Sequence, residues 1–151
     1  GMLSNIYAMQ KDYTKSIANR KNMLAAMEDL LGSSHPHYAS VLGALGQLYV
    51  LINELDTAKD YYQEAYQRFT ALSPKGNFTV TIPLTGLGDI ALRKNQNGAA
   101  LEHMQEAIDI FERDSLPRNS RAAKTFGLYT MALYKNNLIL KTCLHKKKSS
   151  R

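Results

Sequence analysis

A few residues have types and spacings that could support chemistry, and each has a simpler structural interpretation. His35 and His37 form an H-x-H pair that could hold a metal ion, but no carboxylate or thiol stands near them in the sequence. Pro36 lies between them, so we interpret the pair as a turn that starts a helix. Cys143 is the single cysteine and has no paired histidine motif for a nucleophile. We therefore expect no catalytic residue, no metal site and no cofactor, and a protein that is not an enzyme.

The glycines Gly86 and Gly88 could in principle begin a phosphate-binding loop. Such a loop follows a strand, whereas these residues lie inside an apolar stripe with helical spacing and no strand precedes them. Gly88 instead repeats Gly46, which stands 42 positions earlier. This repetition indicates that both glycines belong to a repeated structural unit.

Two segments of the chain match each other at an offset of 42 residues. Five of the seven compared positions are identical, and within each expected helix the positions follow helical spacing. The first set is Leu42, Leu45, Gly46, Tyr49, Ala58, Tyr62 and Ala65, and the second is Leu84, Leu87, Gly88, Ala91, Ala100, Met104 and Ala107. Each set spans two helices, and the second helix begins after Asn53-Glu54 or its equivalent. A hairpin of this kind needs neighbours to bury its apolar stripe.

The apolar pattern and the turn residues place helices along the whole chain. We expect Gly32 to end one helix, Pro36 to begin the next, and Pro83 to lie in the first turn of a helix that starts near Thr81. Loops are expected at 73–77 and 116–120. The expected helices are 3–10, 13–31, 36–52, 55–72, 81 onward, 98–113, 121–135 and 138–146. The fold class is therefore all-α, a right-handed array of antiparallel helix hairpins.

The order of small and aromatic positions resembles the tetratricopeptide repeat. The Leu-Gly pair recurs as Leu45-Gly46 and Leu87-Gly88, and the alanines after the turn are Ala58 and Ala100. The unit of 42 residues resembles the kinesin-light-chain type of this repeat. The resemblance covers roughly residues 3–140, and it implies an α-solenoid that binds other proteins as a scaffold.

The charge of the chain divides it into a body and a tail. Nineteen Lys and Arg against thirteen Asp and Glu give a net charge of +6, and five of the basic residues lie in 141–151. Residues 1–140 then carry fourteen basic and thirteen acidic residues, a net of +1. We expect an array over 2–140, with units of about 2–34, 35–76, 77–118 and 119–145, and a basic tail over 141–151 that is disordered in part. We do not expect this tail to bind nucleic acid or an anionic membrane.

The resemblance implies a binding groove on the concave face, lined by the first helix of each hairpin. Carried over by register, the partner-binding residues are Asn5, Met9, Ser40, Gln47, Val50, Leu51, Thr85, Asp89, Arg93, Lys124, Met131 and Tyr134. One branch of the family binds acidic C-terminal tails through Asn, Lys and Arg. Here Asn5 matches, but Ala44, Ile82 and Gly86 fill the later positions, so the register predicts a poor fit for an acidic tail.

These observations predict a non-catalytic, cytoplasmic interaction scaffold that holds a partner peptide or helix in its groove. The alternative is a regulatory domain that binds a signalling peptide and controls an effector region absent from this chain. Exposed end helices also allow a homo-oligomer.

Overall fold

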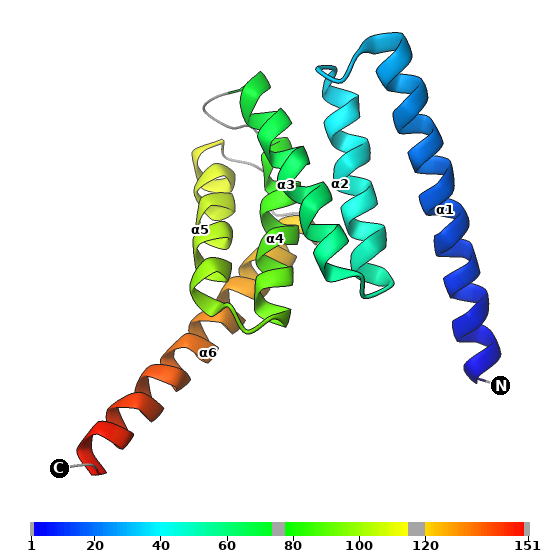
Figure 1. Ribbon diagram of the computed structural model, residues 1–151. Helices are drawn as coiled ribbons and strands as arrows, with labels where there is room; N and C mark the ends of the chain where they lie inside the picture. Colours follow the sequence, from blue (N-terminus) through cyan, green and yellow to red (C-terminus); the bar gives the residue numbers. More distant parts are fainter. Residues whose placement is uncertain (1, 74–77, 115–119, 150–151) are drawn as a thin grey trace.

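The computed structural model describes residues 2–73, 78–114 and 120–149, and side chains for 12–73, 78–114, 120–137 and 139. In this part of the chain every regular element is helical, which confirms the all-α array (Figure 1). The elements are α1 (Met2–Leu31), α2 (Pro36–Leu51), α3 (Leu55–Leu72), the 3₁₀ turn η1 (Phe78–Val80), α4 (Thr81–Arg93), α5 (Asn97–Arg113) and α6 (Ser120–Ser149). In Figure 1 α1 lies at one end of the array, whereas α6 starts behind α4 and runs diagonally past α5 to the opposite end.

Two inner hairpins, α2/α3 and α4/α5, are built in the same way. Each first helix ends at an asparagine with left-handed backbone, Asn53 with φ 63° and Asn95 with φ 58°. Asparagine tolerates this conformation better than most residues. In both turns the next amide reaches back to the first helix, from Glu54 N to the Tyr49 carbonyl (2.9 Å) and from Gln96 N to the Ala91 carbonyl (2.8 Å). The offset of 42 therefore repeats turn geometry as well as sequence.

Each inner hairpin closes by placing a large side chain against a glycine. A Cβ atom built at Gly46 would lie 2.9 Å from the ring of Tyr62, and one at Gly88 would overlap Met104. Tyr62 and Met104 are 5% and 0% exposed. The missing Cβ thus allows α3 and α5 to approach their first helices closely, and burial of each large side chain contributes about 1.5–3 kcal/mol.

The expected starts and ends of the inner helices are confirmed. Gly32 has φ 77°, and its amide donates to the Glu28 carbonyl at the end of α1. His35 is the N-cap of α2, its Nδ1 accepts from the His37 amide (3.3 Å), and Pro36 is the first helical residue. The H-x-H pair therefore serves as a helix cap. Helix α4 begins at Thr81, as expected.

At the two ends of the array the predicted helix boundaries are wrong. We expect breaks near residues 11 and 137, but α1 and α6 are continuous helices of 30 residues each. In the register of 42, the glycine and its large partner are replaced by Ser4 with Arg20, and by Thr130 with Lys146. A helix cannot fold back closely where the small residue has a side chain and its partner is a cation. Straight helices result.

Some of the remaining predicted boundaries fall outside the described residues, and one differs from the structure. Residues 74–77 and 115–119 of the predicted loops lie outside the described residues. Helix α6 continues to Ser149, beyond the expected end near residue 146 and into the basic tail. The division into four units stays a prediction.

Candidate functional site

The first helices of successive hairpins lie side by side because small residues separate them. The position of a Cβ at Gly43 in α2 lies 3.4 Å from the Ile82 side chain in α4. Thr85 in α4 meets Thr125 in α6, with 2.7 Å between their hydroxyl oxygens, and both side chains are buried. These contacts form one continuous surface from α2 through α4 to α6.

A cavity of about 380 Å³ opens on this surface, and we call it the central groove. Its lining comes from all three first helices and from one residue of α3. The lining residues are Gln47, Tyr62, Ile82, Thr85, Gly86, Ser120, Arg121 and Lys124. The mixture of apolar floor and a few polar groups is typical of ligand-binding clefts.

Tyr62 reaches the central groove from behind. Its ring lies between two helices, because a Cβ at Gly46 in α2 or at Gly86 in α4 would run into it. Burial raises the pKa of the Tyr62 hydroxyl, and the nearby charge of Asp89 acts in the same direction. Tyr62 therefore stays neutral and forms a fixed part of the floor.

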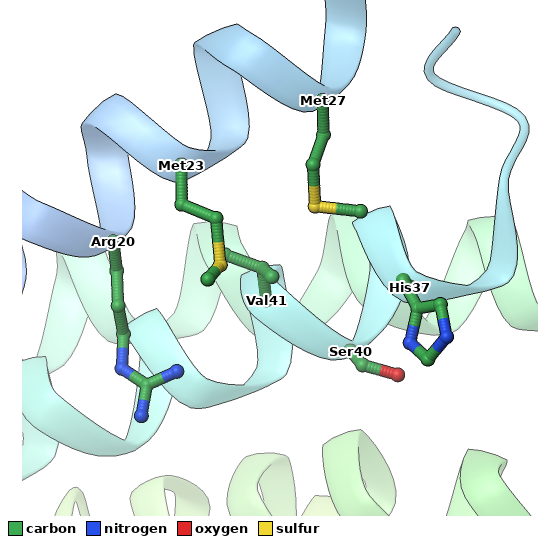
Figure 2. A pocket seen from close by; sticks show the side chains of 6 residues that line it. All are labelled: Arg20, Met23, Met27, His37, Ser40 and Val41. Atoms are coloured by element: carbon green, nitrogen blue, oxygen red, sulfur yellow. The ribbon is translucent and has the colours of Figure 1, made fainter. Parts of the chain in front are cut away.

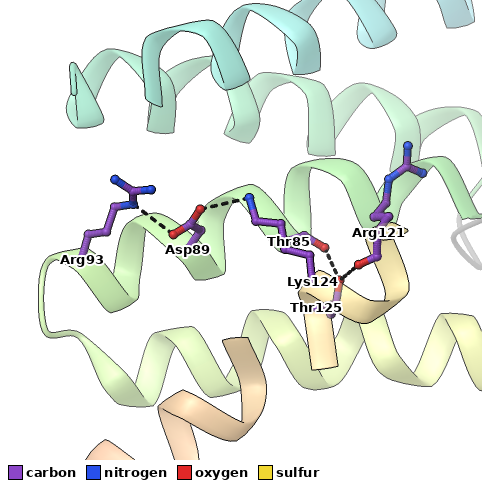
Figure 3. A network of polar contacts seen from close by, with 6 residues as sticks. All are labelled: Thr85, Asp89, Arg93, Arg121, Lys124 and Thr125. Atoms are coloured by element: carbon purple, nitrogen blue, oxygen red, sulfur yellow. Dashed lines mark hydrogen bonds and ion pairs between the residues drawn. The ribbon is translucent and has the colours of Figure 1, made fainter. Parts of the chain in front are cut away.

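Asp89 organises the charged side of the groove. Its carboxylate contacts the Arg93 Nε at 3.0 Å and the Lys124 Nζ at 3.1 Å, while its side chain is 10% exposed (Figure 3). A buried carboxylate needs such partners. Arg93 and Lys124, two cations that the register places in the groove, are therefore already occupied.

Arg121 differs from these cations. It lies in the first turn of α6, and burial lowers the pKa of its guanidinium. No carboxylate pairs with Arg121 in the part of the chain that the structure describes. Figure 3 shows its side chain directed away from Asp89. A half-buried cation without a counter-ion gains from an anionic ligand, since the charge has lost part of its hydration.

The structure brings part of the predicted site together. Gln47, Thr85 and Lys124 line the central groove, and Asp89 and Arg93 adjoin it through their ion pairs. Other predicted residues lie elsewhere: Ser40 lines a separate cavity between α1 and α2, Val50 packs on the core, Leu51 is exposed at the end of α2, and Met131 and Tyr134 are exposed further along α6. Asn5 and Met9 lie in α1, and their side chains are outside the described residues.

The residues that sequence reasoning missed are Ser120, Arg121 and Tyr62. Ser120 and Arg121 stand one helical turn before Lys124, which the register does include. Including the helical turn before Lys124 in the predicted groove would have identified both residues. Tyr62 belongs to a second helix, so a search limited to first helices excludes it.

Two further findings concern metal binding and membrane-spanning helices. Among the described residues, no group of three or more His, Cys, Asp or Glu side chains could hold a metal ion. No helix in the same part of the chain has the length and apolar character that a membrane crossing requires. The cytoplasmic location stays a prediction.

Comparison with known proteins supports the repeat. Residues 1–71 match the family described as tetratricopeptide repeat. The crystal structure of BtubC (BKLC) from P. vanneervenii is similar with a TM-score of 0.73 and 16% sequence identity, over 97% of this chain. This chain spans 59% of that chain's length, and at this identity the likeness shows the fold. No curated protein matches the sequence significantly. Residues 1–71 therefore match the tetratricopeptide repeat, and the chain as a whole shares the fold of this solved structure.

Proposed function

We propose that this chain is a non-catalytic scaffold that holds a segment of a partner protein in the central groove, with an acidic group of that segment on Arg121. Tetratricopeptide repeats generally mediate protein–protein interactions, and the family is typically non-catalytic. The observation that carries the finer proposal is the half-buried Arg121 guanidinium beside a cavity of about 380 Å³.

The groove favours a segment with both apolar and acidic residues. Ile82 and the Tyr62 ring supply apolar floor, and Gln47 supplies an amide that can bond to peptide backbone. Lys124 adds little free charge because Asp89 holds it. Arg121 can bind an acidic group although it is not one of the positions that correspond to the family's clamp for acidic tails.

Selection from a displayed library of random peptides tests the proposal. We expect the selected peptides to carry Asp or Glu and to lose about 10- to 100-fold in affinity for Arg121→Gln, because a charge-assisted hydrogen bond contributes about 1.5–3 kcal/mol. Isothermal titration calorimetry measures the affinity. Arg121→Lys keeps the charge and should retain part of the binding.

Arg113→Gln is the matched control. Arg113 pairs with Asp114 at the end of α5 and does not line the central groove. Equal affinity of wild type and Arg121→Gln for acidic peptides, with both proteins folded, would show that Arg121 is not the anion site.

A further inference from the structure

A second groove lies between α5 and α6, and we call it the α5/α6 groove. It is a cavity of about 510 Å³. Leu101 of α5 and Tyr129 and Leu133 of α6 form its apolar part. Leu133 is 39% exposed although it belongs to this apolar surface. No residue lines both the α5/α6 groove and the central groove, so either groove can be altered without changing the lining of the other.

One wall of the α5/α6 groove carries three carboxylates at helical spacing. Glu102, Glu106 and Asp109 stand at i, i+4 and i+7 of α5, so they form one row about 10 Å long. The Tyr66 hydroxyl donates to Glu106 Oε1 at 2.8 Å. The Gln105 side-chain amide donates to Asp109 Oδ1, also at 2.8 Å. Both donors are neutral, and no Lys or Arg of the described residues forms an ion pair with the row. The charge of the row is therefore held in place without being neutralised.

Comparison with α3 shows how α5 comes to lack a counter-ion for this row. Glu64 of α3 stands 42 positions before Glu106, and it pairs with Arg68 at 2.7 Å. In α5 the position of Arg68 is taken by Ile110, which is buried. Residues 97–112 of α5 contain no Lys or Arg. A cation for the row has to come from outside this helix.

The cavity between α1 and α2 has a similar volume, also about 510 Å³, but a different charge (Figure 2). Met23, Met27 and Val41 form its apolar part. Arg20 lines it, and no Asp or Glu of the described residues does. A basic ligand is therefore repelled from the α1/α2 cavity and attracted to the α5/α6 groove.

We propose that the α5/α6 groove binds a basic amphipathic helix of a partner protein. The groove runs between two neighbouring helices, which the bond from the Tyr129 hydroxyl to Gln105 Oε1 (2.7 Å) links. A third helix can lie along this groove with its apolar face on Leu101 and Leu133. Lys or Arg at i, i+4 and i+7 of that helix repeats the spacing of the carboxylate row, because both helices rise about 1.5 Å per residue. Matching rows of opposite charge select the ligand and its register.

The charge of the whole chain makes such binding selective. Its net charge is +6, so a basic peptide is repelled at long range. The peptide gains attraction only where an acidic surface lies within the screening distance of its own charges. Binding of a basic helix therefore reports on the carboxylate row rather than on the chain as a whole.

A synthetic helical peptide tests the proposal. The probe has about 18 residues, or five helical turns, with Leu along one face and Lys beside it. One control peptide has the same composition in scrambled order, and another carries Glu in place of Lys. Isothermal titration calorimetry should show saturable one-to-one binding of the probe and at least about tenfold weaker binding of both controls. The affinity for the probe should fall as salt is raised, because salt screens ion pairs at a surface.

Two variants locate the binding site. The triple variant Glu102→Gln, Glu106→Gln and Asp109→Asn should bind the probe about tenfold more weakly and lose most of the salt dependence. Leu133→Ser should also bind about tenfold more weakly, because one large apolar side chain loses its contact with the probe. All four side chains are exposed, so folding should survive, as circular dichroism would verify.

Three matched controls should bind the probe like the wild type. Glu112→Gln removes an acid of α5 outside the groove, Met23→Ser alters the α1/α2 cavity, and Arg121→Gln alters the central groove. Absence of saturable binding, equal binding of the scrambled peptide, or unchanged affinity of the triple variant would overturn the proposal. So would dimers of the wild type that exclude the probe, because the occupant of the groove would then be a second copy of this chain.

Discussion

The inner hairpins and the terminal helices use nearly the same sequence pattern, yet only the inner pairs fold back. Asn137 stands in the register of Asn53 and Asn95, the two asparagines that end a helix with positive φ. At Asn137, however, α6 continues as a helix. The inner hairpins add a glycine matched to a large apolar side chain, whereas α6 has Thr130 and Lys146. A turn residue permits the bend, but packing across the hairpin stabilises it.

The largest expected difference in stability is between a glycine-to-alanine substitution in an inner helix and the same substitution in a terminal helix. Gly86→Ala brings a Cβ into the ring of Tyr62 and should destabilise the protein by about 1–3 kcal/mol. Gly127→Ala in α6 meets nothing within 4 Å and should stabilise it by up to about 1 kcal/mol, through helix propensity. Urea denaturation measures both changes. The same sign for the two substitutions would contradict the packing difference.

A smaller change in stability is expected when α6 is given the glycine and the large apolar residue of the inner hairpins. Thr130→Gly together with Lys146→Met restores the small and large pair, and the hairpin should then close at Asn137. The gain is about 1 kcal/mol, since the packed side chain outweighs the poor helix propensity of glycine. Small-angle X-ray scattering at low concentration should show a smaller radius of gyration. Adding Asn137→Ala should reverse the change, and an unchanged radius in the double variant would show that packing does not control the bend.

The smallest effect concerns proton binding by the inner hairpins. Burial lowers the pKa of His103 in α5 below its ordinary 6.5, and Lys59 acts the same way, while Glu106 and Glu102 oppose it. The unfolded chain therefore binds a proton more readily, so stability should fall as pH drops through about 6.5 toward the lower folded pKa. His103→Gln should flatten this part of the curve of unfolding free energy against pH. A curve that keeps its slope would assign the dependence to other groups.

Much of the fold could be predicted from the sequence because the inner hairpins are locally consistent. Gly32, Pro36 and the apolar register place the ends of α2, α3, α4 and α5 to within a residue or two. The candidate site was harder to predict. Register identifies Gln47, Thr85 and Lys124, but it does not show that Asp89 pairs with Lys124. Nor does it show that Arg121 pairs with no carboxylate among the residues that the structure describes. The first fact depends on side chains from α4 and α6 that meet across 35 positions of sequence, Asp89 and Lys124.

The sequence by itself determined the repeat, the type of each inner helix and the poor match to the family's clamp for acidic tails, because these depend on residue types at fixed spacing. Only the tertiary structure decided that α1 and α6 stay straight and that no carboxylate of the described residues pairs with Arg121 in the central groove. Whether a helix bends depends on what its two halves can bury against each other, and whether a charge is free depends on which neighbours reach it. Both are properties of contacts between distant residues.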